Sequence, residues 1–371
     1  MAKQKKNKKN KNHSRSSITP FLEEKDKFLA TIQDQLSKQD VKSEGEAQAF
    51  LNQFIGRSME NVTAEFDTLD HTEADLAEDL LNQAFEATTI AKKRKLAKQA
   101  IETCKTCYQA YDFLASTYSQ PAKAREVFLQ GINIGYEQFA NEINNVPEGE
   151  NSWLWGHIEA RPFLLMLEGK AIYMRENGHI DEAIETYYEI LELNHNDNQG
   201  VREPLLAALI ATDDILGAKE IVSRYPDDSS LGVMIAGVTV TILEELTQID
   251  EEKIHKLEDD INNDNTITVT KMLPKSMKAL KQLTERNLFL PLFISRLEVY
   301  SLPEPHGSIY KGASEAVMAA QLFAAPWMKL GLPLALLSVT SWEAPKKITP
   351  EDQQWLDMMK EEIQNNPFKI D

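Results

Sequence analysis

The sequence predicts an all-α fold, a tetratricopeptide-like helical-repeat solenoid with additional C-terminal helices. Apolar residues recur at helical spacing along most of the chain. Small residues recur at a repeat distance, since Ala218 follows Ala183 by 35 residues. Stretches rich in β-forming residues are scarce, and the longer one, residues 233–241, falls inside the repeat region. The other is residues 266–269.

The clearest repeat unit lies in residues 161–202. Pro162 suits the first turn of a helix, where its missing N–H is not needed. Asn177-Gly178 is expected to end that helix, because glycine takes the left-handed conformation at little cost. Asp181 is expected to cap the next helix with its side-chain oxygen. The apolar face of this second helix is formed by Ala183, Ile184, Tyr187, Ile190, Leu191 and Leu193.

Weaker units flank this one. Downstream, Asp213-Asp214 reads as a turn and cap before Ala218, and Tyr225-Pro226 ends the helix. Upstream, the apolar spacing predicts helices at residues 91–101, 111–115 and 122–128. Because a repeat buries its apolar face on its neighbours, about three or more stacked units are expected.

Two polar motifs, WGHIEARP (155–162) and LNHNDNQGVR (193–202), lie about thirty residues apart. Together they resemble the tetratricopeptide proteins related to suppressor of tumorigenicity 7, including the bacterial-type members of that family. The family pattern usually has Tyr-Met-Arg where this chain has Phe163-Leu164-Leu165, and Pro where it has His195. The resemblance covers about residues 75–245. It implies a helical-repeat fold without an established enzymatic activity.

The chain divides into four predicted segments. These are a disordered basic arm (1–20), an N-terminal helical segment (21–74), the repeat solenoid (75–246) and a C-terminal helical region (247–371). The last boundary rests on a strongly acidic helical stretch at residues 248–265. Inside the solenoid, residues 141–151 are expected to form a turn-rich insertion.

The segment from residue 316 to residue 339 is nearly all apolar and long enough to span a bilayer. Lys329 and two prolines argue against membrane insertion and favour two short buried helices, broken near Pro326 and Pro333. A final helix is expected to begin at Pro350 and to run to about residue 363. Thr349 precedes it as the cap, and Asp352 lies three residues after Thr349.

The net charge of −18 is unevenly distributed. The first 17 residues carry seven basic side chains and no acidic one, so the remaining 354 residues carry a net charge of −25. The basic residues are Lys3, Lys5, Lys6, Lys8, Lys9, Lys11 and Arg15. Such an arm either contacts RNA or the ribosome through phosphate groups or acts as a solubilising tail.

Composition favours a cytoplasmic protein that is not an enzyme. Residues 1–17 lack the apolar core of a secretory signal. Cys104 and Cys107 have the spacing of half a zinc site, but a structural zinc site needs four ligands, so we interpret them as partly buried helix cysteines. No nucleophile elbow or phosphate loop is present, and neither a cofactor nor a metal is expected.

The polar motifs supply the candidate site residues His157, Glu159, Arg161, Asn198 and Arg202. In a binding site, Arg161 and Arg202 would hold a carboxylate or phosphate, and Asn198 would fix a peptide backbone. In a structural network, Glu159 would pair with an arginine, while Asn194 and Asn198 would tie the loop. Both interpretations stay open at this point.

Trp153 and Trp155 flank the first motif, either as anchors for a partner or as plugs between repeats. The leading hypothesis is a scaffold or adaptor that binds a peptide or protein partner in the groove of its repeats. The alternative, from another class, is an RNA- or ribosome-associated factor tethered by residues 1–17.

Overall fold

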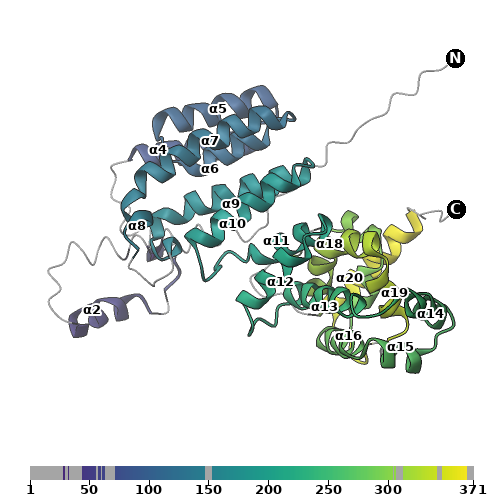
Figure 1. Cartoon of the computed structure of the whole chain (residues 1–371). Helices are drawn as coiled ribbons and strands as arrows, with labels where there is room; N and C mark the ends of the chain where they lie inside the picture. Colours follow the sequence, from purple (N-terminus) through teal and green to yellow (C-terminus); the bar gives the residue numbers. More distant parts are fainter. Residues whose placement is uncertain are drawn as a thin grey trace, which may run out of the picture. The chain divides into compact units, whose positions relative to one another are not determined.

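The structure is a computed structural model (Figure 1). It describes residues 28–29, 32, 44–55, 57–59, 61–62, 72–146, 153–303, 305, 312–340 and 345–365. Every regular element within these ranges is a helix, which confirms the all-α prediction. The basic arm, and most of the predicted N-terminal helical segment (21–74), lie outside the described residues.

The chain forms two compact units. The first comprises residues 1–66 and 303–310, and the second comprises residues 67–302 and 311–371. In the first unit, α2 (Glu44–Leu51) and η1 (Asn52–Phe54) contribute to a small apolar cluster. The buried members of that cluster are Ile32, Phe50, Phe54 and Val62.

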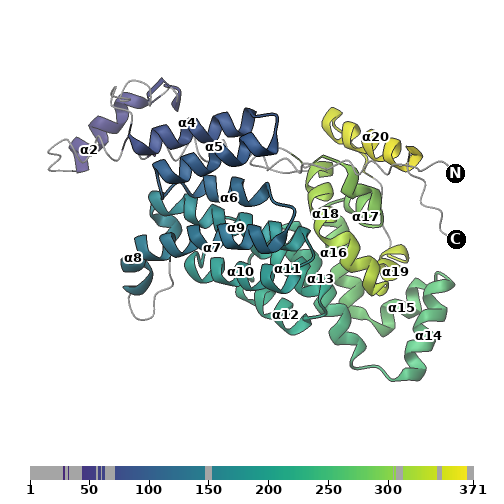
Figure 2. The same cartoon turned by 90° about the horizontal axis from the view of Figure 1, so that it is seen from above.

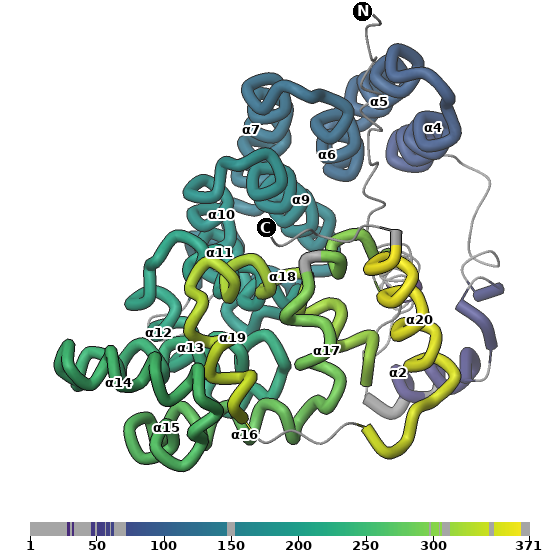
Figure 3. Tube along the Cα trace, turned by 90° about the vertical axis from the view of Figure 1, so that its right-hand side faces the viewer, coloured from purple at the N-terminus to yellow at the C-terminus, as the bar shows by residue number. Residues whose placement is uncertain are grey.

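The second unit begins with helices that pack in sequence order. They are α4 (Glu73–Glu86), α5 (Ile90–Thr103), α6 (Tyr108–Ser116), α7 (Pro121–Gln138), α9 (Arg161–Glu176), α10 (Ile180–Leu193), α11 (Arg202–Ala211), α12 (Ile215–Arg224) and α13 (Leu231–Leu246). Figure 3 shows the pairs α4–α5, α6–α7, α9–α10 and α11–α12 in successive layers. The helices predicted upstream and downstream of residues 161–202 are therefore present.

The turn between α9 and α10 shows why this pair forms. Gly178 has a φ of 81°, and the N–H of His179 donates to the carbonyl of Met174 at 2.9 Å, which closes the end of α9. Ala183 and Tyr187 on α10 are fully buried against it. The small side chain of Ala183 allows the two helices to approach closely.

The predicted cap at Asp181 is wrong. Helix α10 already begins at Ile180, with His179 as the N-terminal flanking residue and no side-chain cap, so Asp181 lies exposed in the first turn. An acidic residue there still interacts favourably with the helix dipole. The predicted turn at Asp213-Asp214 is confirmed, because Asp213 has a φ of 64° and Asp214 accepts the N–H of Gly217 at 2.9 Å.

Short elements replace part of the predicted turn-rich insertion. Helix α8 (Ala140–Asn144) occupies its first residues, and residues 147–152 lie outside the described ranges. Two single-turn helices, η2 (Leu154–Gly156) and η3 (Ile158–Ala160), then lead into α9. Pro162 lies in the first turn of α9, as the sequence predicts.

The C-terminal helices share a core with α11 and α13. They are α14 (Glu251–Asn262), α15 (Thr266–Met272), α16 (Pro274–Arg286), α17 (Leu290–Ile294), η4 (Leu297–Ser301), α18 (Gly312–Leu330), α19 (Leu332–Ser338) and α20 (Pro350–Asn365). Helix α13 packs on α16 and α18, and the indole N–H of Trp327 donates to Thr239 at 2.8 Å. The predicted boundary at residues 246 and 247 thus falls inside one packed unit.

The predicted break at Pro326 is wrong. Helix α18 continues through Pro326 and ends at Leu330, where Gly331 adopts a φ of 73°. Proline usually disrupts a helix by removing a hydrogen bond and displacing a carbonyl. Here the N–H of Ala325 donates instead to the hydroxyl of Tyr300 at 3.1 Å, and Pro326 itself is buried. Pro333 lies in the first turn of α19, where its missing N–H costs little.

Among the described helices, none is by itself long and apolar enough to cross a membrane. Helices α18 and α19 reach that length and hydropathy only as a pair, and they are bent by 100° relative to each other.

Carboxylates from distant segments hold the starts of two helices. Glu245, at the end of α13, accepts the N–H groups of Lys275 at 3.0 Å and Ser276 at 2.7 Å, at the start of α16. Asp352 accepts the N–H of Ala313 at 2.8 Å, which joins α20 to the start of α18 (Figure 2). Asp352 also exchanges hydrogen bonds with Thr349, so the predicted start of the final helix is confirmed.

Candidate functional site

The two polar motifs lie next to each other in the structure. Trp153 and Asn194 form an isolated antiparallel bridge through their backbones. The indole N–H of Trp153 donates to the side-chain oxygen of Asn198 at 3.3 Å, although 45 residues separate the two. We call residues 153–161 and 194–202 the signature loops. They lie before α9 and after α10, so the folding of this helix pair brings them together.

The two tryptophans have different environments. Trp155 is 8% exposed and belongs to the core, and the Arg161 guanidinium lies 5.2 Å from the centre of its ring. Arg161 also donates to the carbonyl of Trp155 at 2.9 Å. Trp153 is 56% exposed. Trp155 therefore fits the plug interpretation, whereas the exposure of Trp153 fits the anchor interpretation.

The exposed ring of Trp153 is held in one place. Asn198 binds its indole nitrogen, and Gly156 lies directly beneath the ring, because a Cβ on Gly156 would be 2.7 Å from a ring carbon. A side chain that is already fixed loses little conformational entropy when it binds a partner. Position 156 therefore requires glycine, because a Cβ there would collide with the ring of Trp153.

Arg202 is paired inside the chain. Its guanidinium binds Asp197 at 2.7 Å and also Asp228, and it lies 5.3 Å from the centre of the Tyr225 ring. Asp197 is buried, has a φ of 49°, and accepts the N–H groups of Val201 and Arg202. Any external anion would have to compete with these two carboxylates for Arg202.

Burial and hydrogen bonding act in opposite directions on these carboxyl groups. Burial raises the pKa of Asp197, although the bonds from Arg202 and Val201 oppose that rise. Burial also acts to raise the pKa of Asp228, but the Ser230 N–H and Arg202 outweigh it, and the pKa is lowered. Burial raises the pKa of Glu203, whose carboxylate lies at the start of α13 beside Gly232.

The remaining contacts of the signature loops are mainly structural. The side-chain amide of Gln199 donates to Glu168 at 3.0 Å and to the carbonyl of Leu164 at 3.2 Å, which fastens the second loop to α9. Asn194 is fully buried, and within the described ranges neither atom of its amide has a hydrogen-bond partner. Buried amides of this kind usually bind an ordered water molecule.

The exposed part of the loops differs from the set that the sequence predicted. His157 and Glu159 are exposed, and the expected pairing of Glu159 with an arginine is not seen among the described residues. Asn196 and Asn198 are exposed on the other loop. We call these four residues together with Trp153 the loop surface. Asn196 was missed because the sequence does not show which asparagine of the loop faces solvent.

The other candidates do not join the loop surface. Lys3, Lys5, Lys6, Lys8, Lys9, Lys11 and Arg15 lie outside the described residues. Cys104 follows the last residue of α5 and Cys107 precedes the first of α6, so they flank a turn and are not helix cysteines as predicted. Both are partly buried, and the described part of the chain holds no cluster of three or more metal-ligating side chains.

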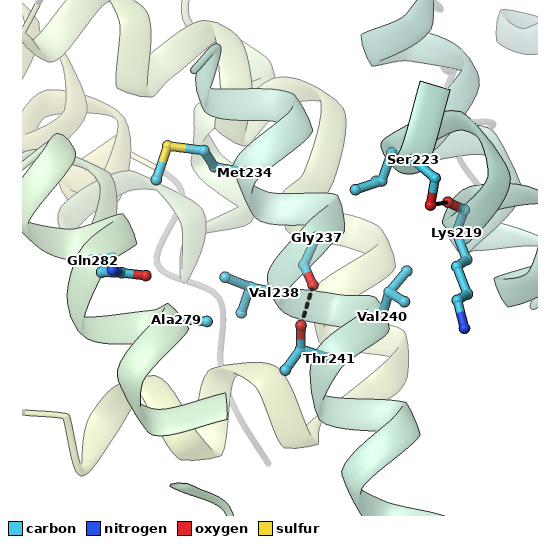
Figure 4. A pocket seen from close by; sticks show the side chains of 10 residues that line it. Lys219, Ser223, Met234, Gly237, Val238, Val240, Thr241, Ala279 and Gln282 are labelled. Atoms are coloured by element: carbon cyan, nitrogen blue, oxygen red, sulfur yellow. Dashed lines mark hydrogen bonds between the residues drawn. The ribbon is translucent and has the colours of Figure 1, made fainter. Parts of the chain in front are cut away.

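An apolar groove lies elsewhere in the second unit, between α12, α13 and α16 (Figure 4). Its volume is about 370 Å³, and its apolar lining includes Val222, Met234, Val238, Val240 and Ala279. Gly237 in the middle of α13 leaves part of it open, since a Cβ there would have no neighbour closer than 3.7 Å. Sequence reasoning missed this groove because its lining comes from three helices that are separate in the sequence.

Comparison of the chain with protein families, with curated proteins and with solved structures found no match.

Proposed function

We propose that this chain is a tetratricopeptide-type repeat protein that serves as a scaffold or adaptor for a protein partner. The order of packing supports the repeat assignment, because α9–α10 and α11–α12 follow each other as short-turned helix pairs. The equivalent small residues Ala183 and Ala218 are both fully buried. The resemblance to the proteins related to suppressor of tumorigenicity 7 rests on the two polar motifs, residues 155–162 and 193–202, and belongs to the same proposal.

The observation that carries the binding function is the exposed, fixed indole of Trp153. Tryptophan is enriched among the residues that dominate protein–protein interfaces. A large apolar ring that is 56% exposed gains from being covered, and its orientation is already set by Asn198 and Gly156. Asn198 contacts the indole, and Asn196, His157 and Glu159 are exposed on the same two loops, where their polar groups can hydrogen-bond a peptide backbone. The apolar groove of α12, α13 and α16 offers a second contact on the same unit.

The test compares partner capture by full-length variants under identical conditions. Trp153→Ala is expected to lose a defined set of proteins that the wild type captures, as measured by quantitative mass spectrometry. Ile267→Ala is the matched control, because Ile267 on α15 is 71% exposed and belongs neither to the signature loops nor to the groove between α12, α13 and α16. Equal capture by the wild type and both variants would show that the loop surface does not bind the partner. Arg202 is unsuitable for this test, because its replacement disturbs internal ion pairs.

The charge of residues 1–17 carries a second candidate function, contact with RNA or the ribosome. About seven phosphate contacts to single-stranded RNA predict that the logarithm of the affinity falls with the logarithm of salt concentration with a slope of about −5. The measurement is a salt titration of RNA binding by the full chain and by a chain that lacks residues 1–17. A shallow slope, or the same slope without the arm, would exclude this role for the arm.

A further inference from the structure

Within the second unit, the pair α4–α5 lies at one end of the stack of helix pairs (Figure 3). Some of the apolar side chains of this pair are exposed. Phe85 faces α6, because its ring lies 4.5 Å from the ring of Phe113. Leu76 is nine residues earlier, which is about two and a half helical turns, so it points to the opposite side of α4. Leu76 is 45% exposed, and Leu80, one turn further along, is only partly buried. The end of a repeat stack normally needs a polar outer face or a cover.

The two helices of this pair carry rows of exposed side chains with opposite charge. Asp79 and Glu86, two turns apart on α4, are exposed, and Lys92 and Lys95 are exposed on the neighbouring α5. None of these four side chains forms an ion pair with another described residue. One helix of the pair is therefore acidic and the other basic, and the two charges are not neutralised locally.

We propose that a second copy of this chain docks on the end face formed by α4 and α5. A two-fold axis parallel to the helices would place α4 of one copy over α5 of the other, and the reverse, in antiparallel orientation. Each acidic row then meets a basic row, while Leu76 and Leu80 from both copies form the centre. This inference is independent of partner binding at the loop surface.

Self-association explains the end face better than RNA binding does. An RNA strand along Lys92 and Lys95 would run beside the carboxylates of α4, whose like charge repels phosphate. A second copy pairs the acidic row of each chain with the basic row of the other. It also covers the leucines, which a phosphate backbone does not.

The test is sedimentation of the full chain over a dilution series, with charge reversal on each row. The wild type is expected to form a concentration-dependent dimer. The double variants Lys92→Glu/Lys95→Glu and Asp79→Lys/Glu86→Lys each place like charges together, so each is expected to raise the dimer dissociation constant about a hundredfold. An equimolar mixture of the two is expected to form a heterodimer, because every facing pair then has opposite sign. Recovery on mixing also shows that both variants are folded.

The matched control is Lys271→Glu/Lys278→Glu, two exposed lysines on α15 and α16, which is expected to leave the dimer unchanged. A wild type that stays monomeric at every concentration would overturn the proposal. A dimer whose dissociation constant is unchanged in both charge-reversal variants would also overturn the proposal. RNA binding that depends on Lys92 and Lys95, in a chain that stays monomeric, would overturn it as well.

Discussion

Arg202 pairs with the buried carboxylate of Asp197 and the partly buried carboxylate of Asp228, and this pairing decides how its replacement should behave. The side chain of Asp197 is 0% exposed and that of Asp228 is 14% exposed. Removing the guanidinium leaves these groups without their cation, which typically destabilises a protein by about 3 kcal/mol or more. We expect Arg202→Met to lower the free energy of unfolding by that amount in denaturant titration.

The control for this prediction is Lys219→Met. Lys219 pairs with Glu244 at 2.5 Å, but its side chain is 55% exposed, so the expected loss is about 1 kcal/mol or less. Equal effects of the two replacements would show that the buried network around Arg202 does not stabilise the fold.

Glu203 should give the stability a distinct pH dependence. Burial raises its pKa in the folded chain above the unfolded value of about 4.3. At a pH between these two pKa values, Glu203 is protonated to a greater extent in the folded chain than in the unfolded chain. Protonation of Glu203 therefore stabilises the folded state increasingly as the pH falls through this range. Glu203→Gln lacks this contribution.

The measurement is the free energy of unfolding of both proteins across a pH series. The variant's stability relative to the wild type should be highest near neutral pH and should fall on acidification. An advantage of the variant that grows as the pH falls has the wrong sign and would contradict the assigned environment of Glu203.

The roles of several individual residues were predictable from the sequence. Pattern and turn chemistry predicted Gly178, Ala183 and Asp214 in their observed roles, because these roles depend on local backbone geometry. The different exposures of Trp153 and Trp155 were not predictable, since both residues lie in the same short loop. Which of them is buried depends on Gly156 and on Asn198, 45 residues from Trp153.

At the scale of elements, Gly237 interrupts the interior of α13 without a steric need. Its missing Cβ would have no neighbour closer than 3.7 Å, which is ordinary van der Waals contact. Glycine within a helix costs about 0.5–1 kcal/mol relative to alanine. We expect Gly237→Ala to raise the free energy of unfolding by about that amount, measured by denaturant titration.

The comparison for Gly237 is Gly135→Ala on α7. A Cβ there would lie 2.2 Å from the ring of Phe163, so this replacement is expected to destabilise the chain. If Gly237→Ala were destabilising as well, the groove between α12, α13 and α16 would not be open as described.

The helix ends mark the limits of element prediction. Helix α18 passes Pro326 because Tyr300, from a different helix, accepts a nearby N–H. The starts of α16 and α18 are held by Glu245 and Asp352, which are about 30 and 39 residues away. Such caps come from tertiary packing, and no local pattern in the sequence signals them.

At the scale of the whole molecule, the core of the second unit crosses the boundary that the sequence suggested near residue 246. Helices α11 and α13 are covered by α16 and α18, and Trp327 binds Thr239 across that boundary. A chain truncated after residue 246 would expose these apolar faces to water. We expect it to lose its cooperative thermal transition and to become sensitive to protease.

The reference for the truncation is the full chain under the same conditions. A truncated chain that melts cooperatively at the temperature of the full chain would show that α11 and α13 need no cover. The all-α class and the helix order were predictable from periodicity alone. The shared core was not, because an acidic stretch at residues 248–265 marks a change in composition and does not report which helices pack together.

The proposed function requires that a protein partner binds the loop surface around Trp153. It is tested by photo-crosslinking in cells, with His157→p-benzoylphenylalanine on the same signature loop as Trp153 and Ile267→p-benzoylphenylalanine on α15 as the reference position. Discrete crosslinked species that appear at position 157 and disappear when Trp153→Ala is added are the predicted result. Crosslinks of the same kind at both positions, or species at position 157 that persist without Trp153, would contradict the claim.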